Sequence, residues 1–240
     1  MSHFPQPHLR GRNPNRLQHD NTAARAPHAR RGSPLSNRAR TAQRNLQLPY
    51  MPPENWYEPT GKGGKYKIVV QNPGQGYRHV LNASEIRARL AQLPPEFTAK
   101  LEMVQLSRMT RKKSRFPCYG MQWGTTLYLY PIEETLIEHY SAQPSPAQWN
   151  EARMYGGRWE CDSAEGWSLI WTEAAIKDFY LNNILIHELG HLLDDRNTRS
   201  IDRERYAEWF ALEYGYKPTM AARTSSTKAS IPRHSKAFYA

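Results

Sequence analysis

The chain has 240 residues, 39% of them hydrophobic, and a formal net charge of +11. This length and apolar content suffice for one domain with a sizeable core and for additional tails. No run approaches the roughly 18 apolar residues that a membrane helix requires, which argues against an integral membrane protein. The two cysteines, Cys118 and Cys161, are too few for a disulfide scaffold and lack metal-pair spacing, and whether they pair with each other stays open.

The positive charge lies at the two ends of the sequence. Residues 1–48 hold nine arginines and one acidic residue, and residues 217–240 hold five basic residues and no acid. Residues 49–216 therefore carry a net charge of −2, so the central segment is close to neutral. Basic ends with few aromatic residues are typical of disordered arms, which can bind nucleic acid, anionic membranes or acidic partner proteins.

The first forty residues are rich in Arg, Pro, Asn and His and do not resemble a signal peptide. We therefore expect a cytoplasmic protein by default, while export without a signal peptide, as in delivered effectors and toxins, stays open. Prolines interrupt any helical or strand period in this part. We expect a disordered arm and linker over residues 1–60, one domain over residues 61–216 and a basic tail over residues 217–240.

The elements expected along the chain indicate a small α+β domain. Residues 49–64 form a linker whose three aromatic residues could dock on the domain. Strands are predicted at residues 65–70, 101–109, 125–130 and 167–171. Helices are predicted at residues 84–93, 132–140, 147–155, 172–195 and about 200–215, with residues 111–115 in a loop. Ser84 and Thr172 are expected as helix N-caps, and Gly215 as the residue that ends the last helix.

The segment Ile184–Asp195 contains the pattern H-E-x-x-H at residues 187–191. His187 and His191, four residues apart on a helix, project from one face. Their ring nitrogens can then bind one zinc ion at about 2.0–2.1 Å. Glu188 is turned by about 100° from His187. From there it can reach a metal-bound water without binding the metal itself.

The residues around this motif are mostly apolar, so the helix is expected to be buried nearly all round. Burying two histidines and a glutamate without partners would cost several kcal/mol, and a metal ion would relieve that cost. The alternative is a helix whose histidines are solvated or hydrogen-bonded to other residues.

A catalytic zinc site needs a third protein ligand and an open position. Glu204, on the next predicted helix, lies on the same side as the small residues Ala207 and Ala211, which would let that helix approach the first closely. Glu204 is therefore the preferred third ligand, and Glu208 is the second choice. Asp194, seven residues after His187, is a candidate partner for a histidine N–H group or a rival ligand.

The metzincin branch of zinc peptidases is excluded, because its longer motif would place Gly and His where this chain has Asp194 and Asn197. A hydrolase of this kind also needs a group that stabilises the oxyanion. The sequence offers several candidates and no reason to choose among them: Tyr206, Tyr214, Tyr216 and His139.

The motif HELGH at 187–191, followed by E-x-x-A-E-x-F at 204–210, resembles the zincin metallopeptidases of the gluzincin branch. The second motif resembles the glutamate helix of the anthrax lethal-factor-like peptidases and related small gluzincins, although only twelve residues separate His191 from Glu204. The resemblance covers about the last 45 residues of the domain. It implies a zincin-like fold, one Zn²⁺ ion held by His187, His191 and Glu204, and Glu188 as the general base.

The resemblance also implies an edge strand just before the motif helix, along which a substrate peptide lies antiparallel. Residues 166–171 are in the right place for that strand, and an interior strand packed by its tryptophans is the alternative.

The function expected from the sequence is therefore that of a zinc metalloendopeptidase, with zinc-bound water as the nucleophile and a protein or peptide as substrate. The alternative is a protein that binds nucleic acid or an acidic partner through its basic ends, with a structural zinc or none. A third hypothesis combines the two, with the arms directing a peptidase to its partner.

Overall fold

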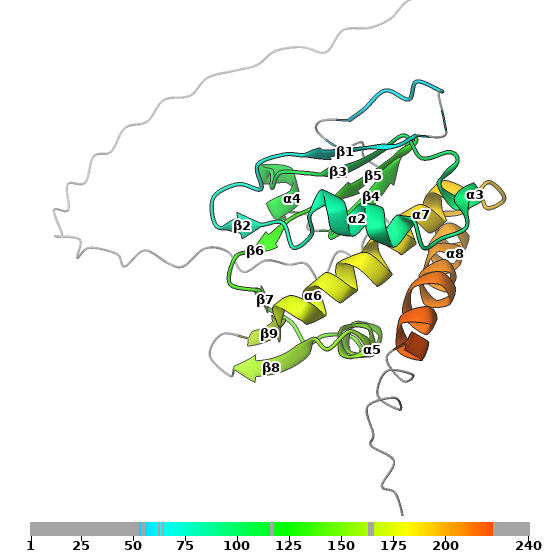
Figure 1. The fold of residues 1–240 in the computed structure, drawn as a ribbon. Coiled ribbons are helices and arrows are strands. Elements are labelled where there is room, and N and C mark those ends of the chain that lie inside the picture. Colours follow the sequence, from blue (N-terminus) through cyan, green and yellow to red (C-terminus); the bar gives the residue numbers. More distant parts are fainter. Residues whose placement is uncertain are drawn as a thin grey trace, which may run out of the picture. The chain divides into compact units, whose positions relative to one another are not determined.

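The computed structural model describes Pro53, Gly63 and residues 56–61, 65–115, 118–162 and 166–222. The predicted arm over residues 1–48 and the last part of the predicted tail, residues 223–240, lie outside this description. The described chain has a mixed α+β fold with three small sheets and several helices (Figure 1). None of the helices in these ranges combines the length and the apolar character needed to cross a membrane.

The largest sheet has four strands in the order β1-β3-β5-β4. Strands β1 (Lys67–Val70), β3 (Met103–Leu106) and β5 (Thr126–Leu129) are parallel, and β4 (Gly120–Trp123) pairs antiparallel with β5 at the edge. The sequence predicted the three parallel strands with longer bounds but did not predict β4. The segment of β4, Gly-Met-Gln-Trp, has no β-branched residue that would favour a strand.

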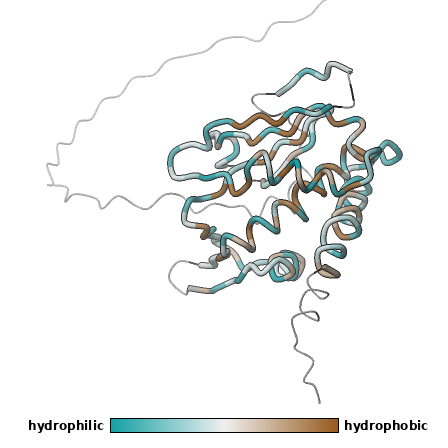
Figure 2. The backbone as a smooth tube through the Cα atoms, in the orientation of Figure 1, coloured by the Kyte–Doolittle hydropathy of each residue, from teal (hydrophilic) through white to brown (hydrophobic). Residues whose placement is uncertain are grey.

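Side chains of this sheet alternate between two faces, as in any strand. Val104 and Leu127 belong to the main hydrophobic core, on the side of helices α2 (Ala83–Leu90) and α7 (Leu185–Leu193). Figure 2 shows hydrophobic residues on both the strands and the helices. Tyr128 points to the opposite face, yet it is fully buried. That second face must therefore also be covered.

Residues 56–61, named the strap below, lie on this second face. The backbone N–H of Tyr57 donates a hydrogen bond of 2.9 Å to the Tyr128 hydroxyl. The ring of Trp56 makes an edge contact with Trp123 on β4, with centroids 6.4 Å apart. Aromatic residues of the predicted linker therefore dock on the domain.

Glu102, just before β3, holds the other end of the strap. Its carboxylate accepts hydrogen bonds from the Thr60 N–H at 2.7 Å, the Thr60 hydroxyl at 3.0 Å and the Gly61 N–H at 2.8 Å. These bonds, led by the one from the Thr60 backbone, lower the pKa of Glu102 below its ordinary value, against the opposing effect of burial.

The remaining strands form two smaller sheets. One is antiparallel with the order β7-β9-β8, built from β7 (Ile137–Tyr140), β9 (Gly166–Ile170) and β8 (Arg158–Asp162). The other pairs β2 (Tyr77–Arg78) with β6 (Ile132–Glu133). The predicted strand at 167–171 is thus confirmed as β9, with bounds shifted by one residue.

The predicted helix over residues 132–140 is wrong, because β6 and β7 occupy this segment. Along β7 the buried residues alternate, and the Tyr140 hydroxyl donates to the buried carboxylate of Glu138 at 2.8 Å. Leu136, in the turn between the strands, has a φ of 59°, which a right-handed helix does not permit.

Helix α2 begins two residues before the start that a Ser84 cap would give, and it ends at Leu90 instead of Leu93. Its N-cap is Asn82 and not Ser84, because the side chains of Asn82 and Glu85 bond to each other's backbone N–H groups. Residues 111–115 form helix α4 (Arg111–Arg115), so the loop predicted there is wrong. Helix α5 (Pro146–Met154) confirms the helix predicted at 147–155, and α3 (Pro95–Thr98) is a further short helix.

The predicted helix after Thr172 is confirmed, and it is interrupted once. The Thr172 side chain caps it by accepting the Ala175 N–H at 3.1 Å. The run consists of α6 (Glu173–Phe179), a π-helical turn η1 (Tyr180–Ile184) and α7. Only two residues, Leu185 and Ile186, therefore separate the π-helical turn from the HELGH motif.

The last helix also contains a π-helical turn. Helix α8 (Ser200–Ala211) starts where the helix at about 200–215 was predicted to start, and it continues into η2 (Leu212–Tyr216) and helical residues 217–222. Gly215 does not end this helix, contrary to the prediction. It is instead a point of close contact with η1, as described below.

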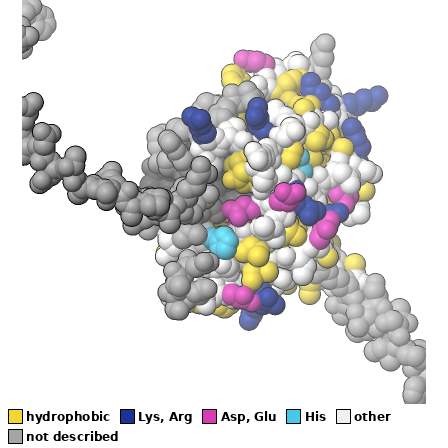
Figure 3. Space-filling view, turned by 90° about the vertical axis from the view of Figure 1, so that its left-hand side faces the viewer, with side chains coloured by type: hydrophobic (Ala, Val, Ile, Leu, Met, Phe, Trp, Pro, Cys, Tyr) yellow, Lys and Arg dark blue, Asp and Glu magenta, His cyan; other side chains and the backbone are white. Residues whose placement is uncertain are grey.

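The exposed side chains are mixed in character. On the face shown in Figure 3, acidic, basic and hydrophobic side chains are interspersed among the described residues. Several exposed carboxylates pair with basic groups, for example Glu173 with Arg78 at 3.1 Å. This mixture agrees with the near-neutral charge of the central segment.

We expect Glu102→Gln to lower the free energy of unfolding at pH 7, because a neutral amide cannot replace the carboxylate that holds the strap. The folded-state pKa of Glu102 is lowered, so its contribution is present above about pH 4.5 and is lost as the pH falls through the lowered value. Urea unfolding at pH 7 and pH 3 measures this. The difference between wild type and variant should shrink at pH 3, and an unchanged difference would contradict the role of the charge.

Candidate metal centre

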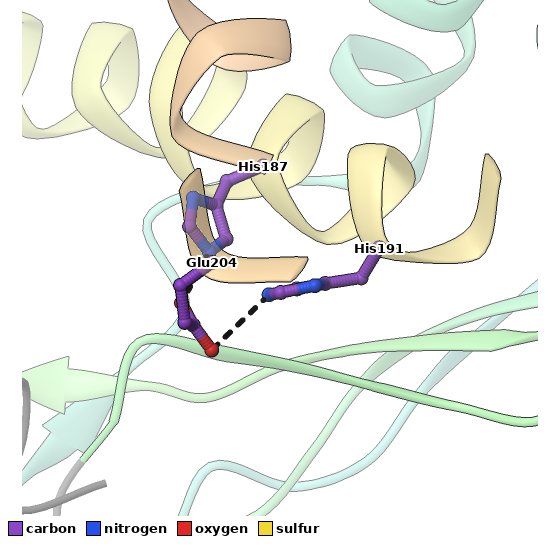
Figure 4. A group of neighbouring side chains, drawn as sticks. All are labelled: His187, His191 and Glu204. Atoms are coloured by element: carbon purple, nitrogen blue, oxygen red, sulfur yellow. Dashed lines mark ion pairs between the residues drawn. The ribbon is translucent and has the colours of Figure 1, made fainter. Parts of the chain in front are cut away.

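Helices α7 and α8 bring three of the predicted site residues together. His187 and His191 project from α7 toward Glu204 on α8 (Figure 4). The distance from His187 Nε2 to Glu204 Oε2 is 3.4 Å, and that from His191 Nε2 to Glu204 Oε1 is 3.5 Å. All three ligand atoms lie within 4.8 Å of one another, so the group could hold a metal ion.

The spacing and chemistry of these donors suit a small divalent ion. Ligand atoms at 2.0–2.1 Å from a tetrahedral zinc ion are about 3.3–3.4 Å apart. Two of the three separations in the cluster are close to this value. Two imidazole nitrogens and one carboxylate oxygen also form a donor set that zinc accepts. The cluster fits such an ion, although a metal-free pairing of Glu204 with the histidines would bring the same atoms together.

The packing of α7 on α8 explains how Glu204 reaches the histidines. A Cβ atom at Gly190 would lie 3.0 Å from the Ala207 Cα and from the Phe210 Cβ, so only glycine fits without a shift. Ala207 and Ala211 are buried, as predicted for the face that approaches α7. The helices therefore cross closely beside His191, which follows Gly190 directly.

A second close approach lies one or two turns away, between the π-helical turns. A Cβ atom at Gly215 of η2 would lie 1.8 Å from the backbone oxygen of Asn182 in η1. The buried side chain of Arg89 spans both, since it donates to Asn182 Oδ1 at 2.6 Å and to the Tyr214 backbone oxygen. Together the two contacts fix the two helices along their length.

Glu188 is buried between α7 and the edge strand β4. A Cβ atom at Gly120 would lie 2.7 Å from Glu188 Oε1, so β4 can approach this carboxylate only with a glycine there. The backbone N–H of Gln122, also on β4, donates a hydrogen bond to Glu188. Burial is the largest influence on Glu188 and raises its pKa above the ordinary value, against the opposing effect of His187 and His191.

Within the cluster, Glu204 and His187 shift each other's pKa values in the direction that favours the charged forms. Burial alone would raise the pKa of Glu204, but hydrogen bonds and charges from His187 and His191 outweigh it and lower that pKa strongly. Burial alone would lower the pKa of His187, but Glu204 and the nearby Glu188 outweigh it and raise that pKa. Without a metal, Glu204 is therefore ionised near neutral pH and faces His187, whose raised pKa favours the protonated imidazole.

The other acidic candidates are not part of the cluster. Asp194 accepts hydrogen bonds from the N–H of Arg196 at 3.3 Å and from the N–H and side chain of Asn197. Asp194 therefore caps the turn after α7, and its described hydrogen bonds do not include one from a histidine N–H group. Nδ1 of His191 is buried and has no hydrogen-bond partner among the described residues. Glu208 lies one turn beyond Glu204 on α8 and is exposed.

The candidate oxyanion groups have other described neighbours. Tyr206 packs against Trp209 and Phe210, and Tyr214 packs against Phe210. Tyr216 contacts Tyr155. His139 contacts Ser168 across the small sheet, with 3.1 Å between Nδ1 and Oγ. None of the four makes a described hydrogen bond to the His/His/Glu group.

Of the two alternatives for residues 166–171, the edge strand is wrong and the interior strand is confirmed. β9 occupies this segment, and it is the central strand of its sheet because β7 and β8 pair with both of its sides. The edge strand beside the motif helix is β4, whose described pairing is with β5 alone. β4 is also the strand that contacts α7.

Several residues near the metal centre were not predicted from the sequence. Gly120 and Gln122 act through their backbones, so their side-chain types gave no signal. Glu151 of α5 accepts a hydrogen bond of 2.6 Å from Asn183, one turn before His187. Only the three-dimensional packing of α5 against η1 brings Glu151 close.

Comparisons with known proteins add no assignment: no family model, curated protein or solved structure matches this chain. The chemistry of the centre therefore has to be argued from the geometry above.

We expect the purified protein to bind about one zinc ion per chain. His187→Ala, His191→Ala and Glu204→Gln should each lose most of that metal, because each removes one donor of the cluster. Glu208→Gln is the matched control on the same helix and should keep it. Metal analysis after dialysis measures the content. Loss in Glu208→Gln but retention in Glu204→Gln would show that the third ligand is Glu208.

Proposed function

We propose that this chain is a zinc metallopeptidase of the zincin type, in the gluzincin branch. The observation that carries the proposal is the convergence of Glu204 on His187 and His191, with Glu188 buried on the flank of the same helix. A structural role for a metal would need a closed set of protein ligands. The described cluster has three candidate ligands, which leaves a position for a reacting group.

The ligands of the proposed ion are His187, His191 and Glu204. A zinc ion bound there would act as a Lewis acid that polarises the scissile carbonyl and makes water a stronger nucleophile at neutral pH. The side chains of these residues are partly exposed, with 21% for His187, 12% for His191 and 42% for Glu204. Such exposure supports access by a substrate.

Glu188 is proposed as the general base. The pKa of Glu188 is raised toward neutral pH. A group whose pKa lies near the working pH can accept a proton in one step and donate it in the next. In this role the carboxylate accepts the proton of the attacking water and then delivers it to the leaving amine. The hydrogen bond from the Gln122 N–H and the contact with Gly120 hold the carboxylate in place.

The proposed substrate peptide lies along β4. This strand pairs with β5 on one side, and no described strand pairs with its other side. An extended peptide can add to such an edge through backbone hydrogen bonds. Because β4 also contacts Glu188, a peptide bound there would pass close to the proposed base and metal ligands.

Replacing Glu188 with Gln should leave the zinc content unchanged and lower kcat by roughly 10²–10⁴-fold, the usual effect of removing a general base. Hydrolysis of a quenched fluorescent peptide mixture by the zinc-loaded protein measures the turnover. The same change at Glu208 serves as control and should leave turnover close to wild type. Turnover that survives in Glu188→Gln would exclude this mechanism.

Gly120→Ala tests the contact between β4 and the base. The added Cβ would meet Glu188 at 2.7 Å and Ile184 at 2.8 Å, so the carboxylate must move. We expect a loss of at least about tenfold in kcat with zinc retained, since a shift of 1 Å in a catalytic group can cost about 10²-fold. Met121→Ala, on the opposite face of β4, is the control. Equal losses in both variants would indicate a general defect of the strand.

A further inference from the structure

A lysine and a cysteine lie in contact at the entry to β4. Lys113 Nζ is 3.0 Å from Cys118 Sγ, and neither Cys118 nor Cys161 forms a disulfide. Cys118 is partly exposed, so a small oxidant can reach its sulfur. Cys161, the second cysteine, is exposed on β8 and lies in another sheet.

The lysine is held in place on the sulfur by its surroundings. Only 6% of Lys113 is exposed, and its Nζ lies 4.2 Å from the centre of the Tyr130 ring. The Lys113 backbone N–H is fixed by the Thr110 hydroxyl at 3.2 Å. Within the described residues Lys113 forms no ion pair with a carboxylate. A buried amine is therefore aimed at a reachable sulfur.

We propose that Lys113 and Cys118 form an oxidation-dependent covalent cross-link, a sulfenamide with a direct S–N bond. A positive group beside a cysteine favours the thiolate, which is the form that peroxides oxidise. The sulfenic acid so formed is reversible and condenses with nearby nucleophiles. At 3.0 Å the Lys113 nitrogen is the nucleophile that the structure places in contact with this sulfur.

The two steps balance as follows. Hydrogen peroxide oxidises the Cys118 thiol to a sulfenic acid and is itself reduced to water. The Lys113 nitrogen, after releasing its ammonium proton to solvent, attacks the sulfur; the S–O bond breaks and the oxygen leaves as water. The chain loses two hydrogen atoms in total. Two equivalents of a small thiol reverse the link and are oxidised to their disulfide.

The link would tie the end of α4 to the start of the edge strand. Cys118 lies two residues before Gly120, whose backbone contacts Glu188. The Tyr130 N–H beneath Lys113 also donates to the Tyr119 backbone oxygen at 2.8 Å. A bond between residues 113 and 118 would therefore restrain the segment that enters β4. The inference does not depend on the metal centre or on peptidase activity.

The test treats the full-length protein with hydrogen peroxide, blocks free thiols by alkylation and digests with trypsin. Trypsin cuts after Lys112, after Arg115 and, as long as its amine is unmodified, after Lys113, so an unlinked chain releases residues 114–115 and 116–153 as separate peptides. In a linked chain Lys113 is no longer cut, and residues 113–115 and 116–153 are the two peptides that the bond would join. We expect the two peptides to stay joined, with a mass about 2 Da below their sum, and to separate after treatment with dithiothreitol. This measurement uses the wild-type chain and needs no variant to fold.

Two variants make the result specific. Lys113→Arg keeps the positive charge but removes the amine, and Cys118→Ser removes the sulfur, so both should abolish the joined peptide. Cys161→Ser should leave it unchanged. The proposal is overturned if Cys118 is oxidised without joining Lys113, if it joins other lysines equally, if it pairs with Cys161, or if the joined peptide keeps an added oxygen.

Discussion

The close packing of α7 on α8 is the constraint on which the metal centre depends. Glu204 reaches both histidines only because the helices approach until Gly190 touches Ala207 and Phe210. A larger side chain at Gly190 would meet Ala207 and Phe210 and push the helices apart, which would move Glu204 away from the histidines. The hydrogen bond from Arg203 to the His191 backbone oxygen, at 3.2 Å, ties the first turn of α8 to the same point. The ligand geometry is thus a consequence of small residues as much as of the ligands themselves.

The part of the centre that sequence could predict is the part that follows from helix geometry. His187 and His191 share a face at any i,i+4 spacing. Glu204 was predictable because Ala207 and Ala211 marked the side of α8 that could approach another helix. The contribution of β4 was not predictable, because Gly120 and Gln122 act through space and backbone. The helix predicted at residues 132–140 is wrong because the buried residues of β7 alternate, which is the period of a strand and not of a helix.

The position of a strand at the edge or in the middle of a sheet depends on the topology of the whole fold and cannot be predicted from the local sequence pattern. β4 and β9 are both short and contain Gly and Trp, and β9 lies next to the motif helix in sequence. Pairing with β7 and β8 places β9 in the middle of its sheet, while β4 lies at the edge of the larger one. Which strand offers a free edge depends on partners far away in the chain. The same holds for the strap, whose anchor Glu102 lies more than forty residues after Trp56.

The π-helical turn ahead of the HELGH motif sets the direction in which the motif faces. A π turn holds about one residue more than an α turn, which corresponds to a rotation of about 100° for everything downstream. The direction of the imidazoles relative to the capping residue Thr172 therefore includes the extra position that η1 holds. Shortening the chain by one residue between them would leave the motif intact as a string of letters and point its ligands elsewhere.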